Sequence, residues 1–367
     1  MGNKTYHSLT EDNIATSERD SRIALDCIYD RCTQGDVSLI ICAGDFFNNS
    51  KPSPEAIRWT IGWFRRMNAL NKPFYIIPGN HDIGAFFHSM EYTKALDLPN
   101  VFLIENDITK ITWGDWNILF APFIIPKSLK NKYADSVELL TQSIKEINPA
   151  EKNIIVTHIQ ESASKLGSEA LMLAKKVEIV NLDNTEKYKN TLFLAGHMHM
   201  QQMYDKVNGI KVVYPGSTTY LDKMDCGQRK GYATISYDGI VSFEAIQGIR
   251  IFKHYILPKD KNPSDFFSSI RMAPREVVFL TVQDDTIMNE LELREALKKK
   301  NCTLGKILYG SPEEIQDIAI DLSTKDPMLQ LEDYLRKREQ LEPIPMQGWQ
   351  NTILPMGMDF YHENKLD

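Results

Sequence analysis

Short apolar runs alternate with amphipathic segments along the first two thirds of this 367-residue chain. Apolar side chains recur at helical spacing in 16–31, 54–70 and 136–147, which predicts three helices. Apolar runs of four to eight residues predict strands at 37–43, 72–78, 101–104, 116–120, 153–156, 191–195, 211–214, 232–237 and 241–246. Helices that alternate with strands, followed by a run of strands, predict an α/β fold in which two sheets form a sandwich flanked by helices.

The last third of the chain has a different pattern. A polar stretch at 258–268 is followed by a strand, a helix and a strand at 276–282, 289–299 and 305–309, which predict a small α+β unit. Beyond residue 312 the chain is charged and helical at 328–340, and then rich in proline. The predicted organisation is a main domain at 1–250, a capping domain at 251–312, and a helical C-terminal tail at 313–367.

Composition narrows the class of protein without fixing the substrate. Hydrophobic residues make up 43% and charged residues 25%, which is ordinary for a soluble globular protein with a sizeable core. The five cysteines are scattered and form no CxxC pair, which favours reduced thiols in the cytoplasm over disulfides or zinc knuckles. No run of about 18 apolar residues predicts a membrane span, and the polar, acidic start is unlike a signal peptide.

The net charge of −7 argues against a generic nucleic-acid binder, which usually has a basic face. A nuclease remains compatible with this charge, because bound divalent cations supply local positive charge that the sequence does not show.

Four of the predicted strands are followed directly by side chains that could bind a metal. In chain order these are Asp45, Asn80 with His81, His158, and His197 with His199. Loops at the carboxyl ends of strands converge on one edge of an α/β sheet, so residues far apart in sequence can meet there. A carboxylate, an amide oxygen and imidazoles form the mixed oxygen and nitrogen set that suits divalent ions such as Mn, Fe or Zn. A carboxylate can also bridge two ions, as in two-metal phosphoester hydrolysis.

Each of these residues also has an ordinary structural explanation. Asp45 could cap a helix or a turn, and Asn80 could simply tolerate a left-handed turn. His81 with Asp82 could be a surface dipeptide, and His158 could be a core histidine with satisfied hydrogen bonds. These separate explanations do not account for the coincidence of all of them at strand ends, so we expect a metal site.

The motifs resemble those of a known superfamily. Gly44-Asp45, Gly79-Asn80-His81-Asp82, His158 and Gly196-His197-Met198-His199 resemble the calcineurin-like metallophosphoesterases in order and approximate spacing. Within that superfamily, 44–54, Tyr214-Pro215-Gly216-Ser217 and Lys230-Gly231 resemble the SbcD-type DNA nucleases of phages and bacteria. The resemblance covers about residues 1–250 well, and the unit after it resembles the capping domain of those nucleases more loosely.

The resemblance implies a role for each residue around two divalent metal ions, with Mn²⁺ the expected metal. Asp45 would bridge the ions, while Asn80, His158 and His197 would complete one site and His199 would belong to the other. His81 would contact the scissile phosphate and assist the leaving group, and Asp82 would orient the His81 ring. Asn48 stands where many SbcD-type nucleases carry a histidine, which puts a DNA-contacting role of this position in doubt.

One motif of that family is missing. The family opens with a strand ending in Asp-x-His, which supplies two ligands to one metal, but no Asp-x-His precedes Asp45. Either the reading frame begins upstream of the given start, or His7, Asp12 or Asp20 substitutes in a reduced site. In either case we expect this sequence to form one complete metal site and one impaired site, with little nuclease activity.

The predicted function is a metal-dependent DNA exonuclease or endonuclease subunit that works with an SbcC-type coiled-coil ATPase in DNA recombination, repair or replication. The segment at 328–338 resembles the helix that docks on the ATPase, although an ordinary surface helix would look the same. Helices at 54–70 and 86–96 could form a homodimer interface or face the core. The alternatives are a metallophosphoesterase for another substrate class and a catalytically impaired scaffold. The expected location is the cytoplasm, or the host cytoplasm if a phage encodes the chain.

Overall fold

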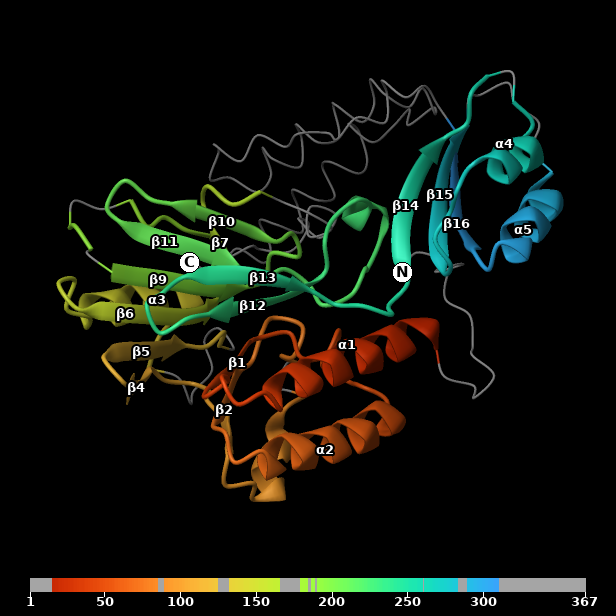
Figure 1. Ribbon diagram of the computed structural model, residues 1–367. Coiled ribbons are helices and arrows are strands. Elements are labelled where there is room, and N and C mark those ends of the chain that lie inside the picture. Colours follow the sequence, from red (N-terminus) through yellow and green to blue (C-terminus); the bar gives the residue numbers. More distant parts are fainter. Residues whose placement is uncertain are drawn as a thin grey trace, which may run out of the picture. The chain divides into compact units, whose positions relative to one another are not determined.

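The computed structural model (Figure 1) describes residues 15–84, 89–124, 132–165, 179–183, 186–188, 190–259, 261–282 and 289–309. The described residues fall into two compact units, of which the larger ends at Arg250 and the smaller begins at Ile251. The predicted tail at 313–367 lies outside the described residues, and so do His7 and Asp12. None of the described helices is long and apolar enough to cross a membrane.

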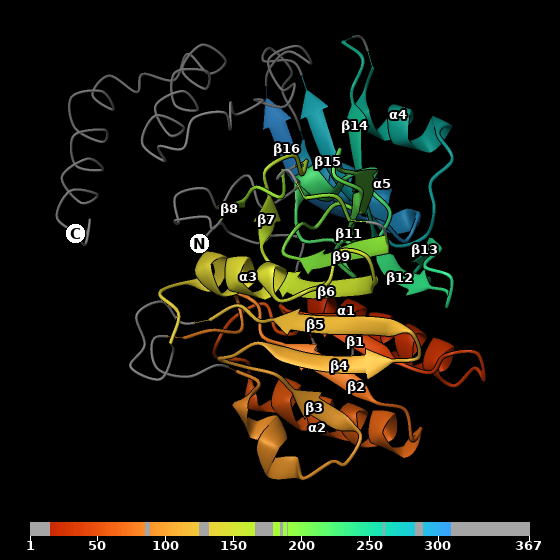
Figure 2. The ribbon, with the colours of Figure 1, turned by 90° about the vertical axis from the view of Figure 1, so that its left-hand side faces the viewer.

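Two sheets lie at the centre of the larger unit (Figures 1 and 2). One is parallel and consists of β1 (Ile40–Ala43), β2 (Phe74–Ile77) and β3 (Val101–Leu103). The other has six strands, in the order β10 (Gln202–Asp205), β11 (Ile210–Tyr214), β9 (Asn190–Gly196), β6 (Lys152–His158), β5 (Trp116–Ala121) and β4 (Thr109–Trp113). Its four inner strands are parallel, and the two edge strands are antiparallel to their neighbours. Each sheet therefore has one edge where the carboxyl ends of its parallel strands collect.

A layer of apolar side chains from both sheets fills the space between them. Its buried members are Ile77, Ile104, Trp116, Ile118, Phe120, Ile154, Val156, Leu192, Leu194 and Val213. Burial of each such side chain stabilises the fold by about 1.5–3 kcal/mol. This layer fixes one sheet against the other, which is what allows loops from both to build one site.

Three helices cover the outer faces of the sandwich. α1 (Thr16–Cys32) and α2 (Pro54–Ala69) pack on the three-stranded sheet, and α3 (Ser136–Lys145) packs on the other sheet. Local sequence explains where two of them begin, because the side chains of Ser53 and Asp135 accept backbone N–H groups of the first turn of α2 and α3, respectively. The predicted α/β sandwich flanked by helices is confirmed, and the helices predicted at 16–31, 54–70 and 136–147 and the nine strands predicted for this unit are present. The helix predicted at 86–96 is described only in part, as the 3-10 helix η1 (Glu91–Leu96).

The two edge strands β4 and β10 were not predicted. Their side chains alternate between half-buried and exposed positions, as expected for strands at the edge of a sheet. The sequences Thr109–Trp113 and Gln202–Asp205 contain few apolar residues in a row, so no strand-like run marks them.

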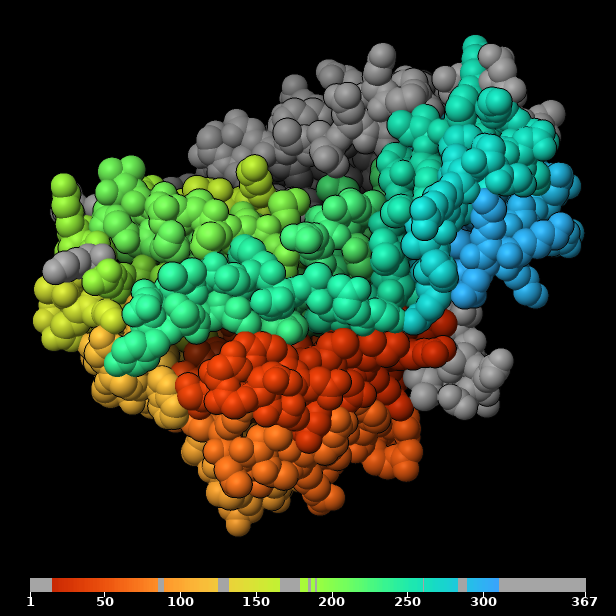
Figure 3. Space-filling view, in the orientation of Figure 1, coloured from red at the N-terminus to blue at the C-terminus, as the bar shows by residue number. Residues whose placement is uncertain are grey.

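A hairpin of β12 (Gly231–Ile235) and β13 (Val241–Ala245) follows the six-stranded sheet and turns at Gly239, whose φ is +82°. Figure 3 shows α1 beside this part of the chain, and Ala24 of α1 packs against Ile246 and Ile249. The carboxylate of Asp20, also on α1, accepts hydrogen bonds from the backbone N (3.2 Å) and Nε (2.6 Å) of Arg250. Asp20 is thus committed to a buried ion pair, which is evidence against it as a replacement metal ligand.

The smaller unit alternates strands and helices in the order β14 (Ile251–Ile256), α4 (Pro263–Ser269), β15 (Glu276–Val282), α5 (Glu290–Lys299) and β16 (Thr303–Tyr309). Its three strands are parallel, with β15 in the middle. The predicted strand, helix and strand are present as β15, α5 and β16. β14 and α4 are additions, and α4 begins inside the polar stretch because Asn262 caps it and Pro263 occupies its first position.

Short elements complete the larger unit: the 3-10 helices η1 (Glu91–Leu96) and η3 (Lys223–Asp225), and the strands β7 (Gln160–Glu161) and β8 (Ile179–Val180). Glu161 of β7 is fully buried and accepts hydrogen bonds from Lys206 Nζ (2.8 Å) and the Tyr204 hydroxyl (2.7 Å). Burial alone raises the pKa of Glu161, but these donors lower it by more, so the pKa lies below its ordinary value of 4.5.

This network predicts a pH dependence of stability. Because the pKa of Glu161 is lower in the folded than in the unfolded chain, its stabilising contribution is present above pH 4.5 and is lost as the pH falls through the folded value. We expect Glu161→Gln to unfold at lower urea concentration than the wild type at pH 7, with a smaller difference at pH 3. Urea unfolding at both pH values measures this, and an equal difference at the two would contradict it.

Candidate metal centre

Strand ends from both sheets supply the residues of the centre. Asp45 follows β1 and Asn80 follows β2, while His158 is the last residue of β6 and His197 comes directly after β9. β6 and β9 are neighbours in register, so that His158 lies opposite Gly196. The carboxyl edges of the two sheets therefore contribute two residues each.

The polar atoms of these four side chains lie within hydrogen-bonding distance of one another. Asn80 Oδ1 lies 3.0 Å from His158 Nε2 and 3.0 Å from His197 Nδ1. Asp45 Oδ2 lies 3.2 Å from His158 Nε2. The rings of His158 and His197 meet edge to face, with centroids 5.3 Å apart. Four residues separated by up to 152 positions thus converge on one small volume, as the sequence predicted.

The donor atoms fit a divalent cation. Protein ligands bind such ions at about 2.0–2.2 Å, so adjacent ligand atoms around one ion lie about 3 Å apart. The distances among Asn80 Oδ1, His158 Nε2, His197 Nδ1 and Asp45 Oδ2 match this spacing. Among the described residues no three His, Cys, Asp or Glu side chains form such a group by themselves, and the four-residue cluster includes the amide oxygen of Asn80.

Hydrogen bonding prepares His158 as a ligand. Its Nδ1 lies 2.7 Å from the backbone carbonyl of Ala43, which can only accept, so Nδ1 carries a proton and Nε2 faces the centre. The side chain is 1% exposed, and burial alone lowers its pKa. The carboxylate of Asp45 raises the pKa by more, so the net shift is upward. A proton on His158 Nε2 is therefore favoured by the Asp45 carboxylate, and it would have to leave before that nitrogen could bind a cation.

Asp45 and His197 have the protonation states that metal ligands need at neutral pH. Burial raises the pKa of Asp45. The charge of His158 and the hydrogen bonds from His158 and His81 lower it by more, so the pKa of Asp45 lies well below its ordinary value. Burial, together with the charge of His158, lowers the pKa of His197 to about 3. Asp45 is therefore a carboxylate and His197 a neutral imidazole.

Two of these residues have a backbone conformation that side chains rarely adopt. The φ angles of Asp45 and His197 are +52° and +83°, in the left-handed region. Such a conformation costs about 1–3 kcal/mol per residue and persists only where the surroundings impose it. Here it turns the chain sharply at the end of each strand and keeps the two side chains in the cluster.

Two glycines allow the strand ends to approach this closely. A Cβ on Gly196 would lie 2.0 Å from the carbonyl oxygen of Ala43 and 2.6 Å from His158 Nδ1. A Cβ on Gly79 would lie 2.2 Å from Asp45 Oδ1. The sequence marked these glycines as parts of motifs, and their missing side chains make room for the Ala43 carbonyl and for the side chains of His158 and Asp45.

His81 is attached to the centre through its backbone and its ring. Its backbone N donates to Asp45 Oδ1 at 2.8 Å, and its ring Nδ1 lies 3.2 Å from the carbonyl oxygen of Asn48. Asn48 thus contacts His81 through its backbone carbonyl, so the type of side chain at position 48 could not reveal this contact.

The hydrogen bonds described for Asp82 join it to other groups than the His81 ring, so its role in orienting that ring stays a prediction. The Asp82 carboxylate is fully buried and accepts from the backbone N of Gly79, Phe46 and Phe47 at 3.0, 3.1 and 2.9 Å. It also accepts from the hydroxyl of Ser89. Asp82 ties the loop after β1 to the loop after β2, and so holds Asp45 and Asn80 in their relative positions.

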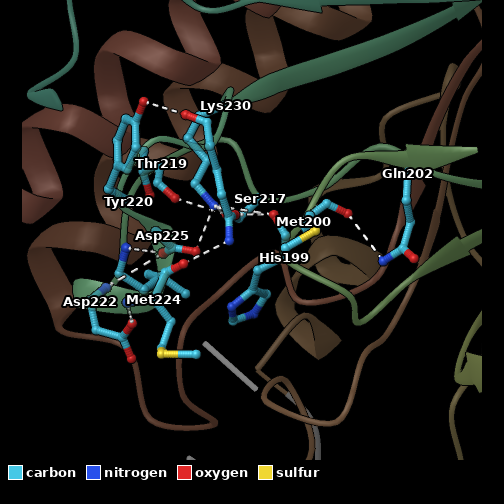
Figure 4. Close-up of polar contacts among 12 residues, drawn as sticks. His199, Met200, Gln202, Ser217, Thr219, Tyr220, Asp222, Met224, Asp225 and Lys230 are labelled. Carbon is cyan, nitrogen blue, oxygen red and sulfur yellow. Dashed lines mark hydrogen bonds and ion pairs between the residues drawn. The ribbon is translucent and has the colours of Figure 1, made fainter. Parts of the chain in front are cut away.

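His199 lies two residues beyond His197, and its backbone carbonyl accepts a hydrogen bond from Ser217 N at 3.0 Å. Its ring projects away from Lys230 in Figure 4. The charge of the His199 ring is among the causes that lower the pKa of His197.

Comparison with known proteins agrees with this geometry. The family model described as calcineurin-like phosphoesterase matches residues 18–201, half of the chain. The chain belongs to the calcineurin-like phosphoesterase family. Members of this family are hydrolases that use divalent metals, so the clustered donor atoms correspond to the chemistry of the family.

Individual relatives are more distant. The DNA double-strand break repair protein Mre11 of Archaeoglobus fulgidus is 24% identical over 295 residues, which cover 76% of this chain and 58% of that protein. The chain therefore spans less than two thirds of the length of this relative. A dimetal phosphatase from Danio rerio is 11% identical with a TM-score of 0.33, covering 53% of this chain and 76% of that one. The sulfate thiohydrolase SoxB of Thermus thermophilus is 11% identical with a TM-score of 0.31, and the match covers 61% of this chain and 41% of that one.

The close approach at Gly196 gives a testable prediction. Gly196→Ala would push its methyl group into the Ala43 carbonyl and the His158 ring, so we expect the affinity for Mn²⁺ to fall at least about tenfold. Gly62→Ala is the matched control, because Gly62 lies in α2 and a Cβ there meets nothing within 4 Å. Isothermal titration with Mn²⁺ measures both variants, and unchanged affinity in Gly196→Ala would contradict the packing argument.

Proposed function

We propose that this chain is a metal-dependent DNA nuclease that hydrolyses phosphodiester bonds. The observation that carries the proposal is the convergence of Asp45, Asn80, His158 and His197 around one volume at hydrogen-bonding distances. Membership of a phosphoesterase family supports hydrolysis of a phosphate ester. The choice of DNA is supported by the name of the relative that repairs DNA double-strand breaks.

The proposed centre holds two divalent ions, with Mn²⁺ as the expected metal. Asn80, His158 and His197 would hold one ion, Asp45 would contribute to both, and His199 would serve the second. Such ions lower the pKa of water and offset the negative charge of a phosphate.

His81 is the proposed proton donor to the leaving group. Its Nδ1 is engaged by the carbonyl of Asn48, so Nε2 is the nitrogen available to a substrate oxygen. The hydrogen bond from the His81 backbone N to Asp45 Oδ1 fixes the position of the His81 backbone relative to Asp45, which is a proposed metal ligand. Asp82 supports both residues indirectly by holding the two loops together.

The proposed setting is DNA recombination, repair or replication in the cytoplasm, with an SbcC-type coiled-coil ATPase as partner. The segment proposed to contact that ATPase, 328–338, lies outside the described residues. α2 and the segment 86–96 are the proposed homodimer surface, and much of α2 is already used, since Trp63, Phe64 and Met67 are buried in the core. A dimer contact would use the opposite face of α2.

A nuclease assay with matched histidine variants tests this function. We expect cleavage of linear DNA that requires added Mn²⁺. His81→Gln should lower the rate about 100-fold or more while Mn²⁺ binding is retained, because it removes the proton donor and no proposed ligand. His254→Gln is the control, since His254 belongs to the smaller unit and its ring bonds the Thr281 hydroxyl, so the rate should not change.

Several results would contradict the proposal. Metal-dependent hydrolysis of phosphomonoesters with no cleavage of DNA would assign the chain to another substrate class. Tight Mn²⁺ binding with no hydrolysis of any phosphate ester would favour a scaffold.

A further inference from the structure

Lys230 carries a charge that is completely buried beside the metal-binding loop (Figure 4). Its ammonium lies 2.8 Å from Asp225 Oδ1 and 2.8 Å from Ser217 Oγ. It also donates to the backbone carbonyl of His199 at 3.1 Å and to Gln228 Oε1 at 3.1 Å. A buried ammonium is tolerated only when its donors are satisfied, and one of the groups that satisfies it here belongs to a residue of the candidate centre.

The partner carboxylate is itself fixed by the backbone. Asp225 is fully buried, and its Oδ2 accepts from Leu221 N at 2.7 Å while Oδ1 takes the ammonium of Lys230. Together with Asp222, it forms a capping box around the short helix η3. The ammonium is therefore held at a defined position.

The His199 carbonyl receives donors from two segments. It accepts from Ser217 N at 3.0 Å and from Lys230 Nζ at 3.1 Å. The loop reaches it because of Gly216, whose φ is +79° and at which a Cβ would lie 2.9 Å from the same oxygen. Lys230 and the 216–217 loop thus clamp the backbone of His199.

This clamp acts on a short loop that is fixed at its other end as well. Gly196 is the last residue of β9 and is paired with His158 of β6, and His197 follows at once with φ +83°. A strained residue of this kind relaxes unless the chain on both sides holds it. The β6–β9 ladder holds one side, and the His199 carbonyl is the point at which the other side is held.

We propose that Lys230 is a positioning residue for the metal centre, which keeps the loop 197–199 in its ligand-bearing conformation through the His199 carbonyl. The inference rests on the proposed function in that it takes His197 and His199 as metal ligands. The competing explanation is that the Lys230–Asp225 pair stabilises the fold and has no effect on metal binding. The two explanations differ in the metal affinity that they predict for a variant that lacks the pair but still folds. The positioning role predicts weaker binding, and the purely structural role predicts unchanged binding.

The test replaces both members of the pair, because removal of one charge would leave the other buried and alone. Lys230→Met with Asp225→Asn removes the ammonium from the His199 carbonyl without an unpaired charge. Asp20→Asn with Arg250→Met is the matched control, since this ion pair is also buried and touches no proposed ligand. Circular dichroism and urea unfolding first establish that each full-length variant is folded.

Mn²⁺ titration of the wild type and the two double variants then distinguishes the two explanations. We expect the Lys230/Asp225 variant to bind its tighter ion about 10- to 100-fold more weakly than the wild type, and the Asp20/Arg250 variant to bind it as the wild type does. Equal affinity in all three proteins would overturn the positioning role, and so would an equal loss in both variants. A wild type that binds no Mn²⁺ would overturn the proposed function itself. If the double variant does not fold, Lys230→Gln with Asp225→Asn takes its place, with the same outcomes.

Discussion

The contact of Asn80 Oδ1 with two imidazoles, at 3.0 Å each, joins the two sheets of the sandwich at the point where their strands end. Asn80 comes from the three-stranded sheet, and His158 and His197 come from the six-stranded sheet. Such a contact requires both sheets to be held at a fixed separation, which the apolar layer between them provides. The centre therefore depends on the packing of the whole larger unit, and a shift of one sheet would separate its donors.

The residues around this contact are held by hydrogen bonds to backbone groups as well as by contacts with one another. Asp82 binds three backbone N–H groups in the loops that carry Asp45 and Asn80. The Ala43 carbonyl orients His158, and the Lys230 ammonium reaches the carbonyl of His199. A strained backbone at a metal centre needs this kind of support, because a side chain is placed only as well as the main chain that carries it.

Much of this architecture follows from the sequence. Apolar runs and helical spacing predicted three helices and nine strands of the larger unit, and the placement of ligand types after strands predicted which residues would meet. The edge strands β4 and β10 were missed because half-exposed strands carry no apolar run. The contacts of Asp82 and Lys230 with backbone groups could not be predicted, because every residue of the chain offers such groups. The positive φ of Asp45 and His197 was equally invisible, because neither residue is a glycine.

The most direct test of the central claim is the anomalous scattering of Mn²⁺ in a crystal of the full chain. The account predicts a peak within about 2.0–2.3 Å of Asn80 Oδ1, His158 Nε2 and His197 Nδ1, with Asp45 on the same ion. A peak at other residues, with these four side chains still bonded to one another, would contradict it.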